Sequence, residues 1–279
     1  AVRRPFFVAI GGAPPHRQAL PQDKGEKTRR MSSSVYLIVA FGAAIAGFVQ
    51  GLSGFAFGLV AMSVWAWVID PQLAAALAVT GALTGQIIAA VTMRRGFDLR
   101  LLAPFVLGGL AGVPLGTLLL PHLDMHWFKT ILGAVLVLWC PAMLLSKDWP
   151  RITVGGRLAD AAVGLGGGIL GGLGGFTGAL PTLWCTLRGY ERDVQRAVIQ
   201  NFNLSMLAVT LTIYVASGIV TRSMLPMILV VLPAMLIPTI VGTRAYIGLS
   251  ETGFRRLVLG LLTVSGIALL LSGLPQLLR

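Results

Sequence analysis

The chain has 279 residues, of which 56% are apolar and only 11% are charged. Soluble globular domains carry about 25% charged residues, so the composition excludes an ordinary soluble protein and indicates a polytopic membrane protein. The formal net charge is +12, but most basic residues outside the tail stand in short loops between apolar segments. Basic residues in such loops are a topology signal, so we expect no nucleic-acid partner.

Residues 1–34 form a basic tail rich in proline and glycine, which we expect to be disordered. Its apolar stretch at 6–10 is too short for the core of a signal peptide. Two interpretations are open: Met31 is the natural start of the protein, or the tail is a genuine basic segment on the membrane surface. The charges of the later loops favour a start at Met31.

Ten apolar segments follow the tail, and we expect helices because hydrocarbon offers the backbone no hydrogen-bonding partners. The first two segments of each set of five are short and separated by glycines. Each such pair is either two tilted spans or a re-entrant hairpin, so about 8–10 hydrophobic segments are expected. The segments are 35–50, 54–69, 73–93, 99–120, 127–145, 158–173, 176–187, 195–217, 224–245 and 254–273.

The loops between these segments carry a strong charge bias. If the chain starts outside and crosses once per segment, the loops near 94–100, 146–157, 188–196 and 244–256 face the cytoplasm. They hold twelve basic residues, against three in the outer loops and the C-terminal end. Cytoplasmic loops are enriched in Lys and Arg, so we expect both ends of the membrane region to lie outside.

The two sets of five segments align with each other. The stretch GFVQGLSGF at 47–55 matches GILGGLGGF at 168–176 at five positions without gaps. Five is an odd number, so related halves would lie in opposite orientations in the membrane. We therefore predict two inverted five-segment repeats, 35–145 and 158–273, joined by a cytoplasmic linker at 146–157 and followed by a C-terminal end at 274–279.

Inverted repeats with glycine-interrupted segments are typical of transporters that bind substrate near the bilayer midplane. A helix break leaves amide N–H groups with partial positive charge, which attract anions. Close helix packing is the alternative role of small residues at four-residue spacing, and it is the better explanation of Gly108, Gly112 and Gly116. The predicted substrate-binding residues are Gln50, Gly51, Leu52, Ser53, Gly54, Phe55, Gln86, Gly172, Leu173, Gly174, Gly175, Phe176, Thr177, Asn201 and Asn203.

The segments carry no carboxylate or basic group clearly in mid-membrane, since Asp160 and Arg196 stand near segment ends. A cation carrier usually needs buried carboxylates, so a neutral, amide-rich cavity indicates a small anionic substrate. The GLSG at 51–54 matches a serine-nucleophile pattern, but His122 and His126 stand together in one outer loop, and no histidine follows Ser53 in an apolar segment. We expect no catalytic residue, no metal and no cofactor.

The motifs GFVQGLSGFAFGLVAMSVWAWVIDP at 47–71 and GGILGGLGGFTGALPTL at 167–183 resemble the sulfite exporter TauE/SafE family of membrane permeases. The resemblance covers about residues 35–273. It implies a multi-pass permease of the bacterial inner membrane for sulfur oxyanions or sulfonates such as sulfite or sulfoacetate. The chain departs from internal symmetry at Val60, which aligns with Pro181, so the two half-sites need not be equivalent.

We therefore expect a secondary transporter that moves a small anion by alternating access. The alternatives are a non-transporting membrane subunit or a membrane-embedded enzyme. The sequence leaves open the anion, the coupling ion and the oligomeric state, a homodimer included.

Overall fold

The computed structural model describes residues 33–92, 96–145, 151–245 and 251–277. Residues 1–32 of the predicted tail, with the expected start at Met31, lie outside these ranges, as do Arg94, Arg95 and Lys147, whereas Ser33 and Ser34, the last two residues of that tail, are helical. Within the described residues the chain is all helical, as the sequence predicts, and contains no strand.

Each of the ten predicted segments coincides with one α-helix, and the ends differ from the predicted ones by a few residues. Two single turns of 3-10 helix, at Leu120–His122 and Arg222–Met224, precede α5 and α9. The α-helices are α1 (Ser33–Ser53), α2 (Phe57–Trp65), α3 (Pro71–Thr92), α4 (Leu99–Leu119), α5 (Met125–Leu145), α6 (Gly156–Gly174), α7 (Ala179–Leu187), α8 (Arg192–Ala216), α9 (Leu225–Ala245) and α10 (Glu251–Leu277).

Seven helices in the described ranges are long and apolar enough to cross a membrane. The helices α2 and α7 are not among them, since each has nine residues and is about 14 Å long at about 1.5 Å per residue. The hydrocarbon core of a bilayer is about 30 Å thick. The predicted segments 54–69 and 176–187 are thus longer than the helices that they contain.

The short helix α2 folds back along α1 to make a helical hairpin. Near the far end of the hairpin, Trp65 Nε1 donates a hydrogen bond of 3.2 Å to the carbonyl oxygen of Val39. The Trp65 ring also lies against Gly42, where a Cβ atom would overlap it. In this hairpin α1 is long enough to span a membrane and α2 is not, so it matches neither two full spans nor a hairpin of two half-helices.

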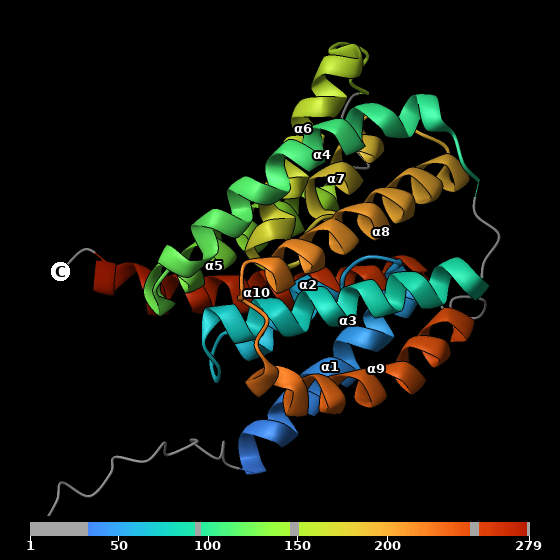
Figure 1. Cartoon of the computed structure of the whole chain (residues 1–279). Helices are drawn as coiled ribbons and strands as arrows, with labels where there is room; N and C mark the ends of the chain where they lie inside the picture. The colour runs from blue at the N-terminus through green and yellow to red at the C-terminus, as the bar shows by residue number, and fades with distance from the viewer. Residues whose placement is uncertain (1–32, 93–95, 146–150, 246–250, 278–279) are drawn as a thin grey trace, which may run out of the picture. The chain divides into compact units, whose positions relative to one another are not determined.

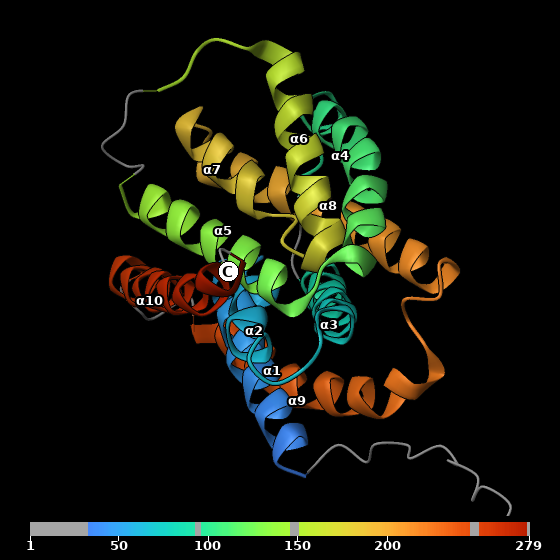
Figure 2. The ribbon, with the colours of Figure 1, turned by 90° about the vertical axis from the view of Figure 1, so that its left-hand side faces the viewer.

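Helix pairs from the two halves pack along each other. The main pairs are α4 with α6, α1 with α9, and α5 with α10. The helices α3 and α8 contact each other and lie between the α1–α9 pair and the α4–α6 pair (Figures 1 and 2). The sequence alignment equates α1 with α6, α3 with α8, α4 with α9 and α5 with α10. If the two halves are exchanged, the α1–α9 contact becomes the α6–α4 contact, whereas the α3–α8 and α5–α10 contacts stay the same. The orientation of the halves in a membrane stays a prediction.

Apolar side chains join α4, α7 and α8. The rings of Phe105 and Phe202 meet edge to face with centroids 6.4 Å apart, and both side chains are fully buried. Met206 and the free thiol of Cys185 complete the same cluster. This packing fixes the position of α8, which carries polar side chains into the candidate site.

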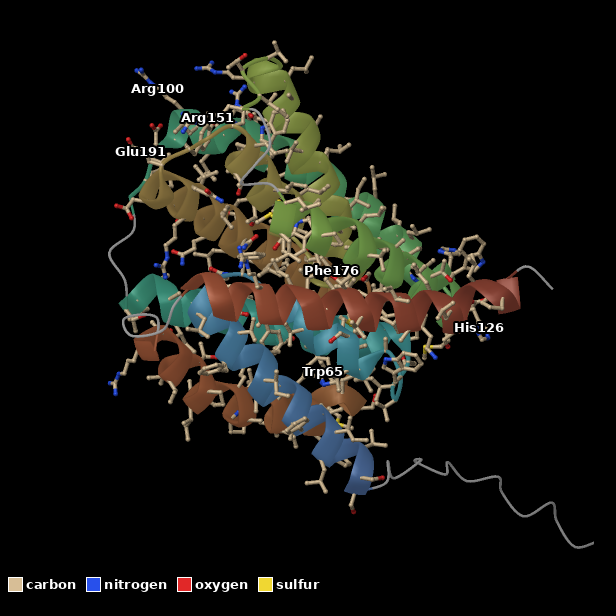
Figure 3. The ribbon with its side chains drawn as sticks, turned by 180° about the vertical axis from the view of Figure 1, so that it is seen from behind. Trp65, Arg100, His126, Arg151, Phe176 and Glu191 are labelled. Atoms are coloured by element: carbon tan, nitrogen blue, oxygen red, sulfur yellow. The ribbon has the colours of Figure 1, made fainter. Side chains whose placement is uncertain are left out.

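Charged loop residues gather at one end of the helices. Arg100, Arg151 and Glu191 lie together at that end, whereas His126 lies at the opposite end and Phe176 lies between them (Figure 3). The predicted topology would place the end with Arg100 and Arg151 on the cytoplasmic side, and this orientation stays a prediction.

The predicted packing role of the glycines on α4 leads to a test. A Cβ atom on Gly112 would overlap the backbone of α6 at Leu165, so Gly112→Leu should force α4 and α6 apart. Ala111 is the preceding residue but is exposed, so Ala111→Leu is the matched control. Overpacking costs about 1–3 kcal/mol or more. We expect a lower melting temperature in detergent for Gly112→Leu alone, and equal values would contradict this packing.

Candidate functional site

Two glycine breaks interrupt the chain at the positions that the sequence predicts. The helix α1 ends at Ser53 and is followed by Gly54 with φ of +83°, while α6 ends at Gly174 and is followed by Gly175 with φ of +77°. Glycine adopts this left-handed conformation without a steric penalty. The Gly54 N–H donates to the Gln50 carbonyl at 2.7 Å, and the Gly175 N–H donates to the Gly171 carbonyl at 2.8 Å. The two breaks therefore have the same local geometry.

Side chains satisfy backbone groups at the first break. Ser53 Oγ donates to the Val49 carbonyl at 2.8 Å and accepts from the Ala56 N–H at 3.3 Å. Gln86 Nε2 on α3 donates to the Gly54 carbonyl at 2.6 Å. The hydroxyl hydrogen of Ser53 is donated to a backbone carbonyl. The hydroxyl is therefore not arranged as a nucleophile beside a base.

The second break is held by a different set of polar contacts. Thr177 Oγ1 donates to Asn203 Oδ1 at 2.8 Å, and Tyr214 Oη donates to the Gly172 carbonyl at 2.6 Å. All three side chains are buried. Each bond ties the break to α8, which comes from the same half of the chain.

The two breaks lie against each other. A Cβ atom on Gly58, near the start of α2, would lie 2.8 Å from the carbonyl oxygen of Gly175. A Cβ atom on Gly178 would lie 3.0 Å from the ring of Phe55 and 2.8 Å from Asn203 Nδ2. The fold thus brings together two stretches that the sequence alignment pairs but does not place in space.

A small pocket adjoins the first break, between α1, α3, α8 and α9. Its volume is about 10 Å³, roughly what one water molecule requires. The lining residues are Gln50, Gly51, Gly54, Gly85, Ala89, Arg196, Gln200, Thr239 and Thr243.

Two amide side chains of the pocket have an atom without a hydrogen-bond partner. Gln50 and Gln200 are each only 3% exposed, and Gln50 Oε1 and Gln200 Nε2 are unpartnered. The Gln50 amide is oriented by its Nε2, which donates to the Ala82 carbonyl at 3.0 Å. A buried polar atom without a hydrogen-bond partner costs about 1–3 kcal/mol of stability. Both atoms therefore favour binding of a polar ligand in the pocket.

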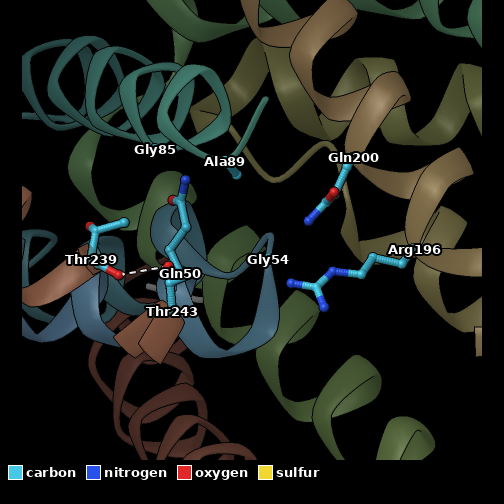
Figure 4. Close-up of a pocket in the computed structure, with 9 residues that line it drawn as sticks. Gln50, Gly54, Gly85, Ala89, Arg196, Gln200, Thr239 and Thr243 are labelled. Carbon is cyan, nitrogen blue, oxygen red and sulfur yellow. Dashed lines mark hydrogen bonds between the residues drawn. The ribbon is translucent and has the colours of Figure 1, made fainter. Parts of the chain in front are cut away.

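The side chains of Arg196 and Gln200 extend from α8 toward Gly54 (Figure 4). A Cβ atom on Gly54 would lie 3.1 Å from Gln200 Nε2. The pocket therefore presents a guanidinium group and an amide N–H group beside the glycine break. Both are donors, and the guanidinium supplies positive charge, so this side of the pocket suits an anion.

The predicted site residues fall into three groups. Gln50, Gly51 and Gly54 line the pocket, and Gln86 lies directly behind it through its bond to Gly54. The other predicted residues of the first break, Leu52, Ser53 and Phe55, lie beside the pocket without lining it. None of the predicted site residues of the second half lines the pocket. These residues are Gly172, Leu173, Gly174, Gly175, Phe176, Thr177, Asn201 and Asn203.

Asn201 and the glycines Gly51 and Gly172 have other contacts. Asn201 Nδ2 donates to the Gly96 carbonyl at 3.2 Å, in the exposed stretch before α4. A Cβ atom on Gly51 would overlap the α9 backbone at Thr239, and one on Gly172 would lie 2.5 Å from the Val113 carbonyl on α4. The packing alternative therefore applies to both glycines, and Gly51 has a packing role as well as a place in the pocket wall.

Four polar lining residues are missing from the sequence prediction: Arg196, Gln200, Thr239 and Thr243. The first two stand four residues apart, as do the last two, and such residues share one face of a helix. That spacing was available as a signal. Arg196 was instead attributed to a cytoplasmic loop, because it stands near the start of its segment.

The second break has no equivalent of Arg196 and Gln200. In the alignment of the halves, Ala75 corresponds to Arg196 and Val79 corresponds to Gln200. A Cβ atom on Gly175 would accordingly lie 3.4 Å from Val79 Cγ2. The two half-sites are thus chemically different, in agreement with the expectation from Val60 and Pro181.

The chain matches a known family. The model of the family described as Sulfite exporter TauE/SafE matches residues 39–269, which is most of the chain. No curated protein and no solved structure matches the chain.

The contact between Gly54 and Gln200 leads to a second test. Gly54→Ala adds strain of about 1–2 kcal/mol at a positive φ and also crowds Gln200. Gly218 has φ of +75°, and a Cβ atom there would have no neighbour within 4 Å, so Gly218→Ala adds the strain alone. We expect thermal unfolding to show a larger loss for Gly54→Ala. Equal losses would show that Gln200 does not press on the break.

Proposed function

The chain belongs to the sulfite exporter TauE/SafE family, and we propose that it is a secondary permease for a sulfur oxyanion or an organosulfonate such as sulfite or sulfoacetate. Family members are membrane transporters rather than enzymes. The observation that carries the proposal is the pocket at the first break, where Arg196 and Gln200 face Gly54.

The charges of the pocket support an anion. Arg196 is the one charged group among the described lining residues, which include no carboxylate. A guanidinium group binds oxyanions through several N–H donors in one plane. The unpartnered Gln200 Nε2 adds a neutral donor within the same space. A small oxyanion could accept from both groups and so replace the interactions that it loses with water.

The pairing of helices supports alternating access between related halves. We take 35–145 and 158–273 as inverted repeats whose breaks meet in the interior. The contacts between helices are in line with this, because they stay the same when the two halves are exchanged. We take the small size of the pocket as a state in which the substrate path is shut. Rocking of one half against the other would open it, since the breaks belong to different halves.

The position of the pocket supports uptake of substrate from the cytoplasm. Ala89 near the end of α3, Thr243 near the end of α9 and Arg196 near the start of α8 all line it. The predicted topology places these three helix ends on the cytoplasmic side. Export, the role that the family description names, would begin at such a site.

The proposal predicts saturable transport. Proteoliposomes holding the full chain should move sulfite, sulfoacetate or thiosulfate with saturable kinetics, and each of these anions should compete with the others. Sulfate is included to measure selectivity. The measurement is uptake of labelled anion against protein-free vesicles. Absence of flux for all four anions, from protein shown to be folded, would favour a non-transporting subunit instead.

The pocket also predicts a specific role for Arg196. A hydrogen bond to a charged group contributes about 1.5–3 kcal/mol, so Arg196→Gln should weaken the apparent affinity for the anion by about 10- to 100-fold. Arg196→Lys keeps the charge but loses the planar donors and should be intermediate. The readout is the initial rate of flux at several anion concentrations.

The matched control is Arg222→Gln. Arg222 is exposed in the short helical turn before α9, outside the pocket. Its substitution removes the same charge from the protein, and we expect the affinity to stay unchanged. If Arg196→Gln and Arg222→Gln behaved alike, the pocket would not be the anion site.

A further inference from the structure

We propose that the pocket recognises a monoanion that carries its own hydrogen-bond donor, such as a protonated oxyanion or a hydroxylated sulfonate. This inference rests on the proposed transport function and narrows its substrate class: sulfite qualifies as hydrogen sulfite, whereas sulfoacetate and thiosulfate, which are dianions without a donor at neutral pH, do not. It follows from the fact that the two sides of the pocket have opposite hydrogen-bonding character.

The α8 side of the pocket consists of donors. Arg196 has only N–H groups to offer, and the unpartnered atom of Gln200 is its Nε2. A single guanidinium supplies a single positive charge. This side therefore matches one negative charge spread over the oxygens of a small anion, rather than the double charge of a dianion.

The opposite side, formed by α1 and α9, offers acceptors. Gln50 Oε1 is buried and unpartnered. The amide cannot turn over at low cost, because Nε2 is held by the Ala82 carbonyl at 3.0 Å and rotation would bring two oxygens together. Gln50 therefore presents an acceptor that water does not reach.

The two threonines of α9 have the same character. Thr239 Oγ1 donates to the Met235 carbonyl at 2.7 Å, and Thr243 Oγ1 donates to the Thr239 carbonyl at 2.8 Å. A hydroxyl has one hydrogen, so each of these oxygens can only accept a further bond. Thr239 Oγ1 lies against Gly47 on α1, where a Cβ atom would be 2.8 Å from it, so the acceptor wall on the α1–α9 side of the pocket is defined by Gln50 and Thr243.

An anion whose atoms are all acceptors would satisfy the donors of α8 and leave the acceptor wall unpartnered. A monoanion with an O–H or N–H group satisfies both sides at once. Sites with buried polar groups discriminate strongly against analogues that leave those groups unpaired. The acceptor wall therefore acts as a selectivity element for the donor on the substrate.

The test uses two sulfonates that differ by one hydroxyl group. Isethionate (2-hydroxyethanesulfonate) and ethanesulfonate have the same charge and sulfonate group, and only isethionate carries a donor. Proteoliposomes with the full chain are assayed for inhibition of labelled sulfite flux and for direct uptake of each sulfonate. We expect isethionate to inhibit sulfite flux at about one tenth of the concentration that ethanesulfonate requires, or at a still lower concentration.

The variant Gln50→Met removes the unpartnered acceptor at similar volume and should bring the two sulfonates toward equal potency. Gln86→Met is the matched control, because Gln86 is also a buried amide that donates to a backbone carbonyl, at 2.6 Å, but does not line the pocket. It is expected to lower the potency of both sulfonates alike and to preserve their ratio.

The outcomes separate the two proposals. Equal potency of the two sulfonates in the unaltered protein, with sulfite flux present, would overturn the inference and leave the transport function standing. Equal potency together with a dependence on sodium would assign the acceptor wall to a cation instead. An unchanged ratio in Gln50→Met would also contradict the inference. Absence of flux for sulfite and both sulfonates would overturn the transport function and this inference with it.

Discussion

The satisfaction of backbone groups at the two helix breaks is the constraint on which the rest of the structure depends. In an apolar environment, each carbonyl or amide freed by a break needs a new partner. Gln86 provides one for the Gly54 carbonyl, and Tyr214 provides one for the Gly172 carbonyl just before the second break, each at 2.6 Å. Because these side chains stand on α3 and α8, the two central helices must lie beside the breaks.

The same local break gives different chemistry in the two halves. At Gly175 the neighbouring side chain is the apolar Val79, and the polar side chains at that break bond to each other or to the backbone. At Gly54 the neighbour is Gln200, with Arg196 one turn earlier on α8, and a small polar pocket remains. A shared backbone geometry therefore serves close packing in one half and a candidate anion site in the other.

Much of the fold could be predicted from the sequence, because length and hydropathy determine which segments can be membrane helices. The breaks were also predictable, since glycine is the residue that adopts a positive φ freely. The short lengths of α2 and α7 were not, because the apolar residues around them continue into turns. The pocket was found only in part: Gln50 and Gly54 belong to a recognisable motif, whereas Thr239 and Thr243 reach it through the packing of α9 on α1, which no local pattern encodes.

The central claim is that a small anion binds at the first break and not at the second. Hydrogen–deuterium exchange of the full chain, with and without saturating sulfite, tests it directly. The account predicts slower exchange on sulfite addition in 50–57 and 196–201, and no change in 171–178. Slower exchange confined to 171–178, or no change in any of these segments while sulfite is transported, would contradict it.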